Sequence, residues 1–222
     1  MAPTAKPQRR TPAPTGKGKT PPLPLPDLLL NATTTPDVVT VPFRTVVCLD
    51  GQGAPEGDAF PRAIMAIYGI AYPLKFSRKK RGGGDFKIGP LEARWWTDDP
   101  VRRFPDTPRD TWRWQLRIAV PRDVTDRELT QTIGAATQKK GGKLEGNPDV
   151  ARVRVAGLPA TRYGRVLHVG PYATETESFE RIVETLKAAG LAPGKAHSEV
   201  YLSDPRRIKP EKLRTVLLLE LA

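Results

Sequence analysis

Residues 43–51 read FRTVVCLDG, and residues 161–170 read TRYGRVLHVG. Both stretches are rich in β-branched and apolar residues and stop at a glycine, which is typical of a strand. Each is followed by a segment whose apolar residues recur at helical spacing. We therefore expect each stretch to begin a structural unit in which a strand leads into a helix.

The first unit continues with a helix and two more strands. An apolar stripe at intervals of three and four residues predicts the helix: Phe60, Ile64, Ile67, Ala71 and Leu74. After a basic turn at residues 79–84, residues 86–96 and 111–120 have the composition of strands, joined by a loop rich in Pro and Asp. A short helix should follow, because residues 125–128 form a capping box. The expected order is β-α-β-β.

The same order recurs in the second half of the chain. A capping box at residues 174–177 and a second apolar stripe predict a helix that stops at Gly190. Residues 196–202 and 213–221 are then expected to form two strands. The identity between the halves is low, so the order of elements and a shared Gly and Glu carry the inference. The predicted fold class is α+β: duplicated β-α-β-β repeats about a pseudo-two-fold axis, with antiparallel sheets, helices packed on them and a central ligand groove.

We place repeat one at residues 43–145 and repeat two at 150–222, which together form one domain in a chain of 222 residues. Residues 1–42 are expected to be a disordered, proline-rich basic tail. Five basic residues without an acid lie before residue 27, so much of the net charge of +12 belongs to this tail. No uninterrupted apolar stretch follows the basic residues, so the tail does not fit a secretory leader. It is interpreted as a solubility segment, and a weak nucleic-acid tether is the alternative.

Two further features indicate a cytoplasmic protein. The single cysteine, Cys48, excludes a framework of internal disulfides and fits a reducing compartment. No segment approaches the roughly 20 consecutive apolar residues that span a bilayer. We expect no membrane partner, and nucleic acid is expected to bind weakly at most.

Glu92 and Glu199 occupy equivalent positions in the two repeats and are the expected catalytic residues. Side chains two apart on a strand share a face, so Glu199 should lie beside Tyr201, and Glu92 beside Trp96. A carboxylate among aromatic rings is desolvated, which raises its pKa, and it can pair with a flat cationic ligand. The alternative is that each glutamate forms a structural ion pair with a neighbouring basic residue.

The aromatic residues divide between core and cleft. Tyr68 and Tyr72 lie beside the apolar stripe of the first helix, and the sequence does not decide whether they edge the core or wall the groove. Trp96 is assigned to the cleft because it shares a face with Glu92. Trp112 and Trp114 share a face with apolar residues, which favours the core for both.

The sequence predicts no cofactor and no metal ion. His168 and His197 are the only histidines, and neither has a partner at the spacing of metal ligands. The triple glycine at residues 82–84 lacks the Gly-Lys-Ser/Thr ending of a phosphate loop.

Several motifs in order resemble those of the GyrI-like small-molecule-binding proteins: LDGQGAP (49–55), AYPLKF (71–76), PLEARWW (90–96), HVGPY (168–172), SEVYLSDP (198–205) and LRT (213–215). The resemblance covers residue 43 to the C-terminus. It implies the effector-binding fold of multidrug-responsive regulators, in which the carboxylate that matches Glu199 neutralises cationic drugs and aromatic rings sandwich them. The segment before residue 43 is too short to supply the DNA-binding domain of those regulators, so we do not expect a transcription factor.

Some stand-alone members of this family hydrolyse the cyclopropane of DNA-alkylating natural products of the yatakemycin and duocarmycin type, and the resemblance implies the same self-protecting reaction here. Such a reaction needs a base for the water and a donor for the phenolate that forms. We assign Glu199 as the base or water-positioning group, Glu92 as a second base or proton carrier, and a tyrosine or His168 as the donor. The expected ligand-binding residues are Tyr68, Tyr72, Trp96, His168, Tyr172 and Tyr201.

Two points stay open at this stage. Arg94 stands where many family members have leucine, and we expect its charge beside Glu92 to alter the preference for ligand charge. A non-catalytic module that sequesters a compound or docks on another protein is the alternative to a hydrolase, and the sequence does not define the oligomeric state.

Overall fold

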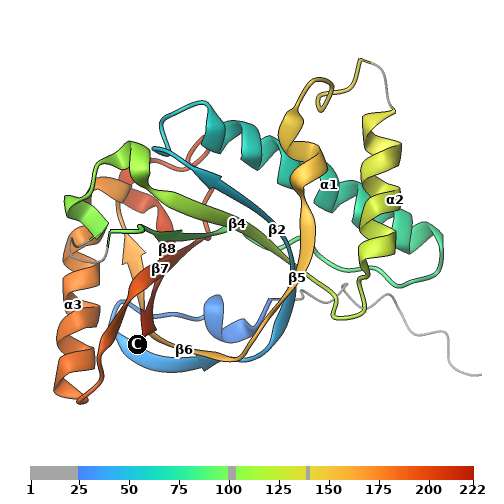
Figure 1. Ribbon diagram of the computed structural model, residues 1–222. Coiled ribbons are helices and arrows are strands. Elements are labelled where there is room, and N and C mark those ends of the chain that lie inside the picture. Colours follow the sequence, from blue (N-terminus) through green and yellow to red (C-terminus); the bar gives the residue numbers. More distant parts are fainter. Residues whose placement is uncertain (1–24, 100–103, 139–140) are drawn as a thin grey trace, which may run out of the picture.

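The computed structural model describes residues 25–99, 104–138 and 141–222, and Figure 1 shows how their helices and strands are arranged. The strands are β1 (Asp37–Val41), β2 (Arg44–Gln52), β3 (Glu92–Trp96), β4 (Arg113–Val120), β5 (Arg154–Leu158), β6 (Thr161–Val169), β7 (Pro193–Tyr201) and β8 (Arg214–Leu221). The α-helices of these ranges are α1 (Ala59–Lys80), α2 (Asp126–Thr137) and α3 (Glu175–Ala188).

All eight strands belong to one antiparallel sheet with the order β1-β6-β8-β7-β3-β4-β2-β5. The repeat units are β2-α1-β3-β4 and β6-α3-β7-β8. The strand that follows the helix in each unit, β3 or β7, lies at the centre of the sheet. There β3 of the first half pairs with β7 of the second. This mirrored order confirms the α+β fold and the duplicated arrangement that the sequence predicts.

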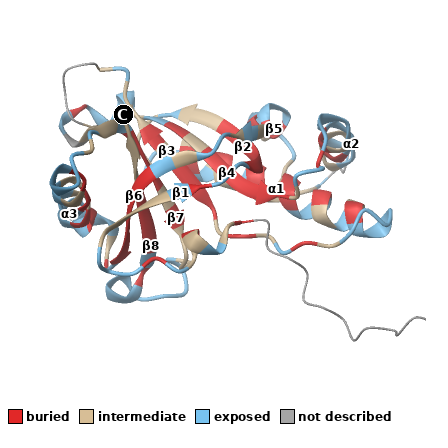
Figure 2. Ribbon diagram, turned by 90° about the horizontal axis from the view of Figure 1, so that it is seen from below, coloured by how far each residue is buried: buried red, intermediate tan, exposed pale blue. Residues whose placement is uncertain are grey.

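The helices cover one face of the sheet. Val47, Leu49 and Leu116 of the first half pack against the apolar side of α1, and Val166 and Leu217 of the second half pack against α3. Figure 2 shows the buried residues concentrated in the strands and on the sheet-facing sides of these helices. Burial of this apolar surface is the dominant favourable term in folding. The helix face of the sheet is therefore built from two separate cores, one under each helix.

Residues 25–32 cover the opposite face of the sheet and residues 37–41 join the sheet as β1, which corrects the prediction of a disordered tail through residue 42. Leu29 is fully buried, and β1 adds to the edge of the sheet by pairing with β6. Arg165 fixes this segment by donating from Nε to Asp37 at 2.9 Å. The proline and threonine content of this segment suggested disorder, but its few apolar residues pack into the core on this face of the sheet. The rest of the predicted tail, residues 1–24, lies outside the described residues.

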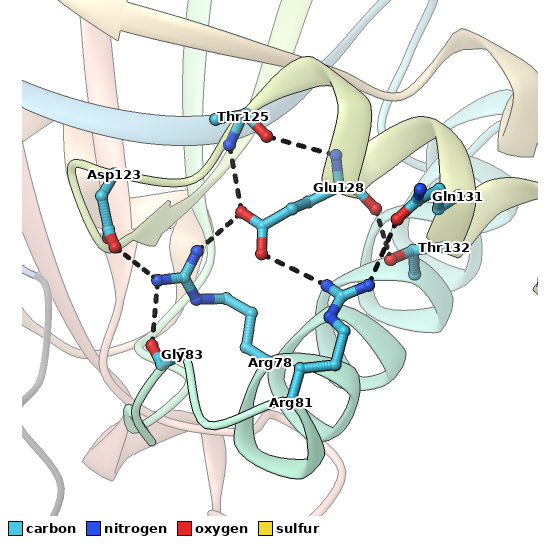
Figure 3. A network of polar contacts seen from close by, with 8 residues as sticks. All are labelled: Arg78, Arg81, Gly83, Asp123, Thr125, Glu128, Gln131 and Thr132. Carbon is cyan, nitrogen blue, oxygen red and sulfur yellow. Dashed lines mark hydrogen bonds and ion pairs between the residues drawn. The ribbon is translucent and has the colours of Figure 1, made fainter.

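The C-terminal end of α1 is fixed to the start of α2 by the polar network in Figure 3. The buried guanidinium of Arg78 donates to Asp123 and to Glu128, at 2.7 Å each, and to the backbone oxygen of Gly83 at 3.0 Å. Glu128 also completes the expected capping box with Thr125. One carboxylate thus caps α2 and binds α1, which locks the two helices together.

The second expected capping box is wrong. Thr174 is the N-cap residue of α3, but its side chain accepts no hydrogen bond from the helix. Its Oγ1 donates instead to the backbone oxygen of Pro171 at 2.9 Å. The 3-10 turn Tyr172–Thr174 (η5) tightens the chain here and turns the hydroxyl away from the helix.

No helix in the described parts of the chain is long and apolar enough to cross a membrane.

Candidate functional site

A groove of about 2140 Å³ lies on the helix face of the sheet, and residues of α1, α3, β3 and β7 line it. It occupies the region between the two helix-covered cores, where β3 meets β7. Such a crevice between two halves is a usual place for a ligand.

The pairing of β3 with β7 decides which glutamate faces this groove. Ala93 lies opposite Glu199, and Glu92 lies opposite Val200. Directly opposed side chains share a face, and neighbours along a strand alternate. Glu199 therefore points to the groove with the helices, whereas Glu92 points to the other face. The prediction that both glutamates share one groove is wrong.

Glu92 forms the structural ion pair that was the alternative. It is 2% exposed and pairs with two buried arginines, accepting from Arg44 at 2.9 Å and from Arg117 at 2.8 Å. Burial acts to raise the pKa of Glu92, but the two guanidinium groups outweigh it and lower this pKa to about 2. A carboxylate held ionised in this way is no proton carrier, so its assignment as a second base is also wrong.

Three other expected residues lie away from the groove lining. Trp96 shares the face of Glu92, as its spacing requires, and stacks with the guanidinium of Arg94 at 5.0 Å. Arg94 itself donates to Glu220 at 2.6 and 3.0 Å, so its charge is neutralised there and does not reach the groove. His168 is buried, with Nδ1 3.0 Å from Ser178 Oγ, which leaves it no route to a ligand as donor.

The remaining expected residues do lie along the groove. Tyr68 and Tyr72 of α1 form part of its wall, with ring centroids 6.2 Å apart, and Tyr68 also packs against the edge of the core. Tyr172 and Tyr201 lie 5.9 Å apart beside Glu199. Their roles in binding stay predictions, but the structure places all of them with Glu199 on one surface.

A second carboxyl group that the sequence analysis missed meets Glu199. Glu175, the first residue of α3, is 7% exposed and lines the groove, and its Oε1 has no hydrogen-bond partner among the described residues. Burial and the charge of Glu199 raise the pKa of Glu175 to about 9, against a small opposing effect of a hydrogen bond from Thr215. Burial beside a second carboxylate thus favours the protonated form of Glu175.

Glu199 is held by its neighbours on β7. Tyr201 Oη donates to Glu199 Oε2 at 2.6 Å, and His197 Nε2 lies 3.3 Å from Oε1. Burial, together with the charge and the hydrogen bond of Glu199, raises the pKa of Tyr201 well above its usual value. The tyrosine consequently stays protonated and keeps the carboxylate oriented. Two carboxyl groups held in different surroundings within one groove are the usual equipment for acid–base chemistry.

Aromatic rings surround Glu199 and its neighbour His197. The sequence analysis predicted other positions for some of these rings and did not identify others. Phe104 packs 4.8 Å from His197 and 4.3 Å from Trp112, and Phe179 of α3 lies 4.7 Å from the same histidine. Trp112 packs against the core, as predicted, and also lines the groove, while Trp95 takes the place expected for Trp96. Alternation along β3 predicts that Trp95 lines the groove once the face of β3 that meets Glu199 is known. No local sequence pattern predicts that Phe104 lies there.

In the ranges that the structure describes, no three His, Cys, Asp or Glu side chains are grouped so as to hold a metal ion.

The architecture is that of known proteins. An uncharacterized conserved protein from Listeria innocua is 29% identical, with a TM-score of 0.77, over 86% of this chain and 94% of its own. A hydrolase from the same organism is 28% identical, with a TM-score of 0.74 and the same coverage. These matches confirm the GyrI-like fold that the sequence motifs indicated.

A weaker match is the structure of SAV2435 bound to tetraphenylphosphonium, which is 12% identical, with a TM-score of 0.41, over 84% of this chain and 93% of its own. No family model and no curated protein sequence matches the chain.

The buried ion pair of Glu92 can be tested by Glu92→Gln. We expect a loss of about 3–5 kcal/mol in the free energy of unfolding, because two buried guanidinium groups lose their counter-charge. Since the folded pKa of about 2 lies below the usual 4.5, this contribution is present above pH 4.5 and fades as the pH falls. Urea unfolding at several pH values measures it.

Glu220→Gln is the matched control, because its ion pair with Arg94 is partly open to solvent, unlike that of Glu92, and its loss should cost less, about 1 kcal/mol. An equally small cost for Glu92→Gln would contradict the structural role.

The protonation of Glu175 can be tested by Glu175→Gln, which keeps the shape of the neutral acid. The folded pKa of about 9 exceeds the usual 4.5, so the stability that the proton of Glu175 supplies is complete below pH 4.5 and is lost as the pH rises through 9. Glutamine does not titrate, so we expect the melting temperature of the variant to exceed that of the wild type by more at pH 8.5 than at pH 5. Exposed Glu177→Gln on the same helix is the control, and parallel pH profiles for wild type and Glu175→Gln would refute the assignment.

Proposed function

We propose that this protein is a cytoplasmic small-molecule-binding hydrolase that takes flat, hydrophobic or cationic compounds into its groove. Its substrates are ring-strained electrophiles, the cyclopropane-bearing DNA-alkylating natural products, and their hydrolysis protects the cell. The observation that carries the proposal is the placement of two carboxyl groups in different surroundings, Glu175 and Glu199, in one aromatic-walled groove.

Glu199 is the base in this mechanism. Its carboxylate takes a proton from a water molecule, and the water oxygen forms a bond to the cyclopropane methylene carbon. The bond between that carbon and the conjugated ring system breaks, and its electron pair moves through the dienone to the carbonyl oxygen, which becomes a phenolate. Ring strain and the gain of aromaticity drive the step, so general-base assistance of about a hundredfold or more suffices for useful turnover.

Glu175 is the acid that receives the developing charge. A proton from its carboxyl group converts the phenolate to a phenol, and the proton on Glu199 then passes to Glu175, directly or through water. One water molecule is consumed and both carboxyl groups return to their starting states. The unpartnered Oε1 of Glu175 is free to bind this oxygen or the attacking water. Glu175 thus replaces Glu92 and His168 in the roles that the sequence analysis gave them.

The aromatic residues position the flat substrate. Trp95, Phe104 and Trp112 form one cluster of rings beside His197, and Tyr172 and Tyr201 form a second pair of rings beside Glu199. Burial and the two nearby glutamates raise the pKa of Tyr172 to about 12, so its hydroxyl stays neutral and able to donate. Rings of this kind bind a planar ligand by stacking and exclude water from the carboxyl pair.

The relationship to the Listeria innocua proteins supports a hydrolase. One of them bears that description, and the match covers 94% of its length at 28% identity.

Turnover of a duocarmycin-type cyclopropane compound, followed by mass spectrometry of the ring-opened product, tests the proposal. We expect catalytic hydrolysis by the wild type and a loss of about a hundredfold or more in kcat for Glu199→Gln and for Glu175→Gln. Glu177→Gln, exposed on α3 and away from the groove lining, should retain the wild-type rate. Water labelled with oxygen-18 should place the label on the former methylene carbon.

Stoichiometric protection of the compound without ring-opened product would refute the enzyme and favour a sequestering module. Equal rates for the wild type and both glutamine variants would refute the assignment of the acid and the base.

A further inference from the structure

The segment that joins β7 to β8, residues 204–214, is strongly basic, and we call it the basic loop. It contains two acidic residues and five basic ones, and the basic side chains are all exposed: Arg206, Arg207, Lys209, Lys212 and Arg214. The contacts of these side chains decide whether their charge is open to a partner.

A second basic run in the folded chain is largely neutralised. The turn after α1, at residues 79–84, begins with three consecutive basic residues. In the fold Lys79 pairs with Asp85 at 2.9 Å, and Arg81 pairs with Glu128 at 3.2 Å. This turn therefore has acidic partners that cancel much of its charge.

In the basic loop two arginines share one carboxylate. Asp204 accepts from the backbone N–H of Arg206 at 3.0 Å, and from its Nε and Nη2 at 2.9 Å each. Arg207 lies 3.6 Å from the same carboxylate. The two arginine side chains are nevertheless 86% and 84% exposed. The pair keeps a net positive charge, and Asp204 fixes the turn that carries it.

The rest of the basic loop adds more positive than negative charge. Lys209, Lys212 and Arg214 form no ion pair with any described residue, and Glu211 is the acidic side chain among them. Leu213 is buried, which fixes this part of the loop on the sheet. The charge is thus held on an ordered part of the fold and is open to solvent.

The basic loop borders the groove. Arg206 and Arg207 belong to the groove lining although they are highly exposed, so they lie at its rim. Lys209 and Lys212 lie outside the lining. A partner that binds the whole loop therefore lies beside the groove entrance and is distinct from the compound inside it.

The chemistry of the basic loop favours a phosphodiester backbone among anionic partners. A guanidinium group presents planar N–H donors that match the oxygens of a phosphate. Within residues 204–214, Ile208 is the one large apolar side chain that is exposed, at 40%. Docking on a membrane surface needs more apolar area than this, and a protein interface needs a well-packed apolar or aromatic centre.

From these observations we propose that the basic loop docks on the phosphate backbone of duplex DNA and brings the groove entrance beside it. The contact is electrostatic and independent of base sequence. The preference for phosphate follows from the loop itself, whereas the choice of DNA rests on the proposed function, whose substrates react with DNA. Docking places the hydrolase where those compounds act.

Fluorescence anisotropy with a short labelled DNA duplex of mixed sequence, at about 50–200 mM salt, tests the proposal. It compares the full-length wild type with the loop variant Arg207→Gln/Lys209→Gln/Lys212→Gln and the control variant Lys80→Gln/Arg127→Gln/Lys143→Gln. The control residues lie on the α1–α2 side of the molecule, are exposed and do not line the groove. Both variants lose the same charge and keep the basic N-terminal segment.

We expect the wild type to bind the duplex at low salt and the loop variant to bind it about tenfold or more weakly, with a salt slope reduced by about two to three. The control variant should stay close to the wild type. The duplex should also protect Lys209 and Lys212 of the wild type from chemical acetylation more than Lys80 and Lys143, which mass spectrometry measures without any substitution.

The proposal is overturned if the duplex does not bind at low salt, or if the two variants lose equal affinity. It is also overturned if duplex RNA, or vesicles of equimolar phosphatidylcholine and phosphatidylserine, bind through the basic loop more tightly than DNA. Failure of the proposed function is seen separately, because a lack of ring-opened product leaves loop-dependent binding of DNA unchanged.

Discussion

The antiparallel pairing of β3 with β7 is the constraint on which the site depends. It joins the two halves of the sheet, and its register places Ala93 and Glu199 on one face and Glu92 and Val200 on the other. A shift of one residue would exchange these sets, because side chains alternate along a strand. The groove, its aromatic walls and its carboxylate all follow from this register. The two glutamates of the shared motif thus have separate tasks, one in each face of the sheet.

Glu92 and Glu175 show how environment sets the role of a buried carboxyl group. Both are almost fully buried, which by itself raises the pKa of an acid. Glu92 meets two guanidinium groups, which reverse the effect and hold it ionised as a structural anchor. Glu175 lies near another carboxylate instead, whose charge adds to the effect of burial and favours the protonated form. Burying a carboxyl group beside a second carboxylate destabilises the fold, but it supplies a group that can donate a proton. Such a loss of stability is common at functional positions.

The sequence was sufficient for the order of elements and for much of the groove. Periodicity located α1 and α3, and the motif around Glu199 and Tyr201 identified the β7 side of the site. It could not decide which face of β3 meets that side, because the register between distant strands is set by tertiary packing, so Glu92 and Trp96 were misplaced together. Glu175 looked like an ordinary acidic residue in a first helical turn. Only the fold brings Glu175 near Glu199. In the same way, residues 37–41 are ordered as β1 only because they pair with β6, which lies far away in the sequence.

The central claim is that two carboxyl groups share the groove and that one of them keeps its proton at neutral pH. Carbon-13 NMR of protein labelled at the glutamate side-chain carboxyl carbons measures this directly across a pH titration. The account predicts one glutamate resonance that titrates near pH 9, disappears in Glu175→Gln and moves to lower pH in Glu199→Gln. Titration of every glutamate below about pH 5 would contradict it.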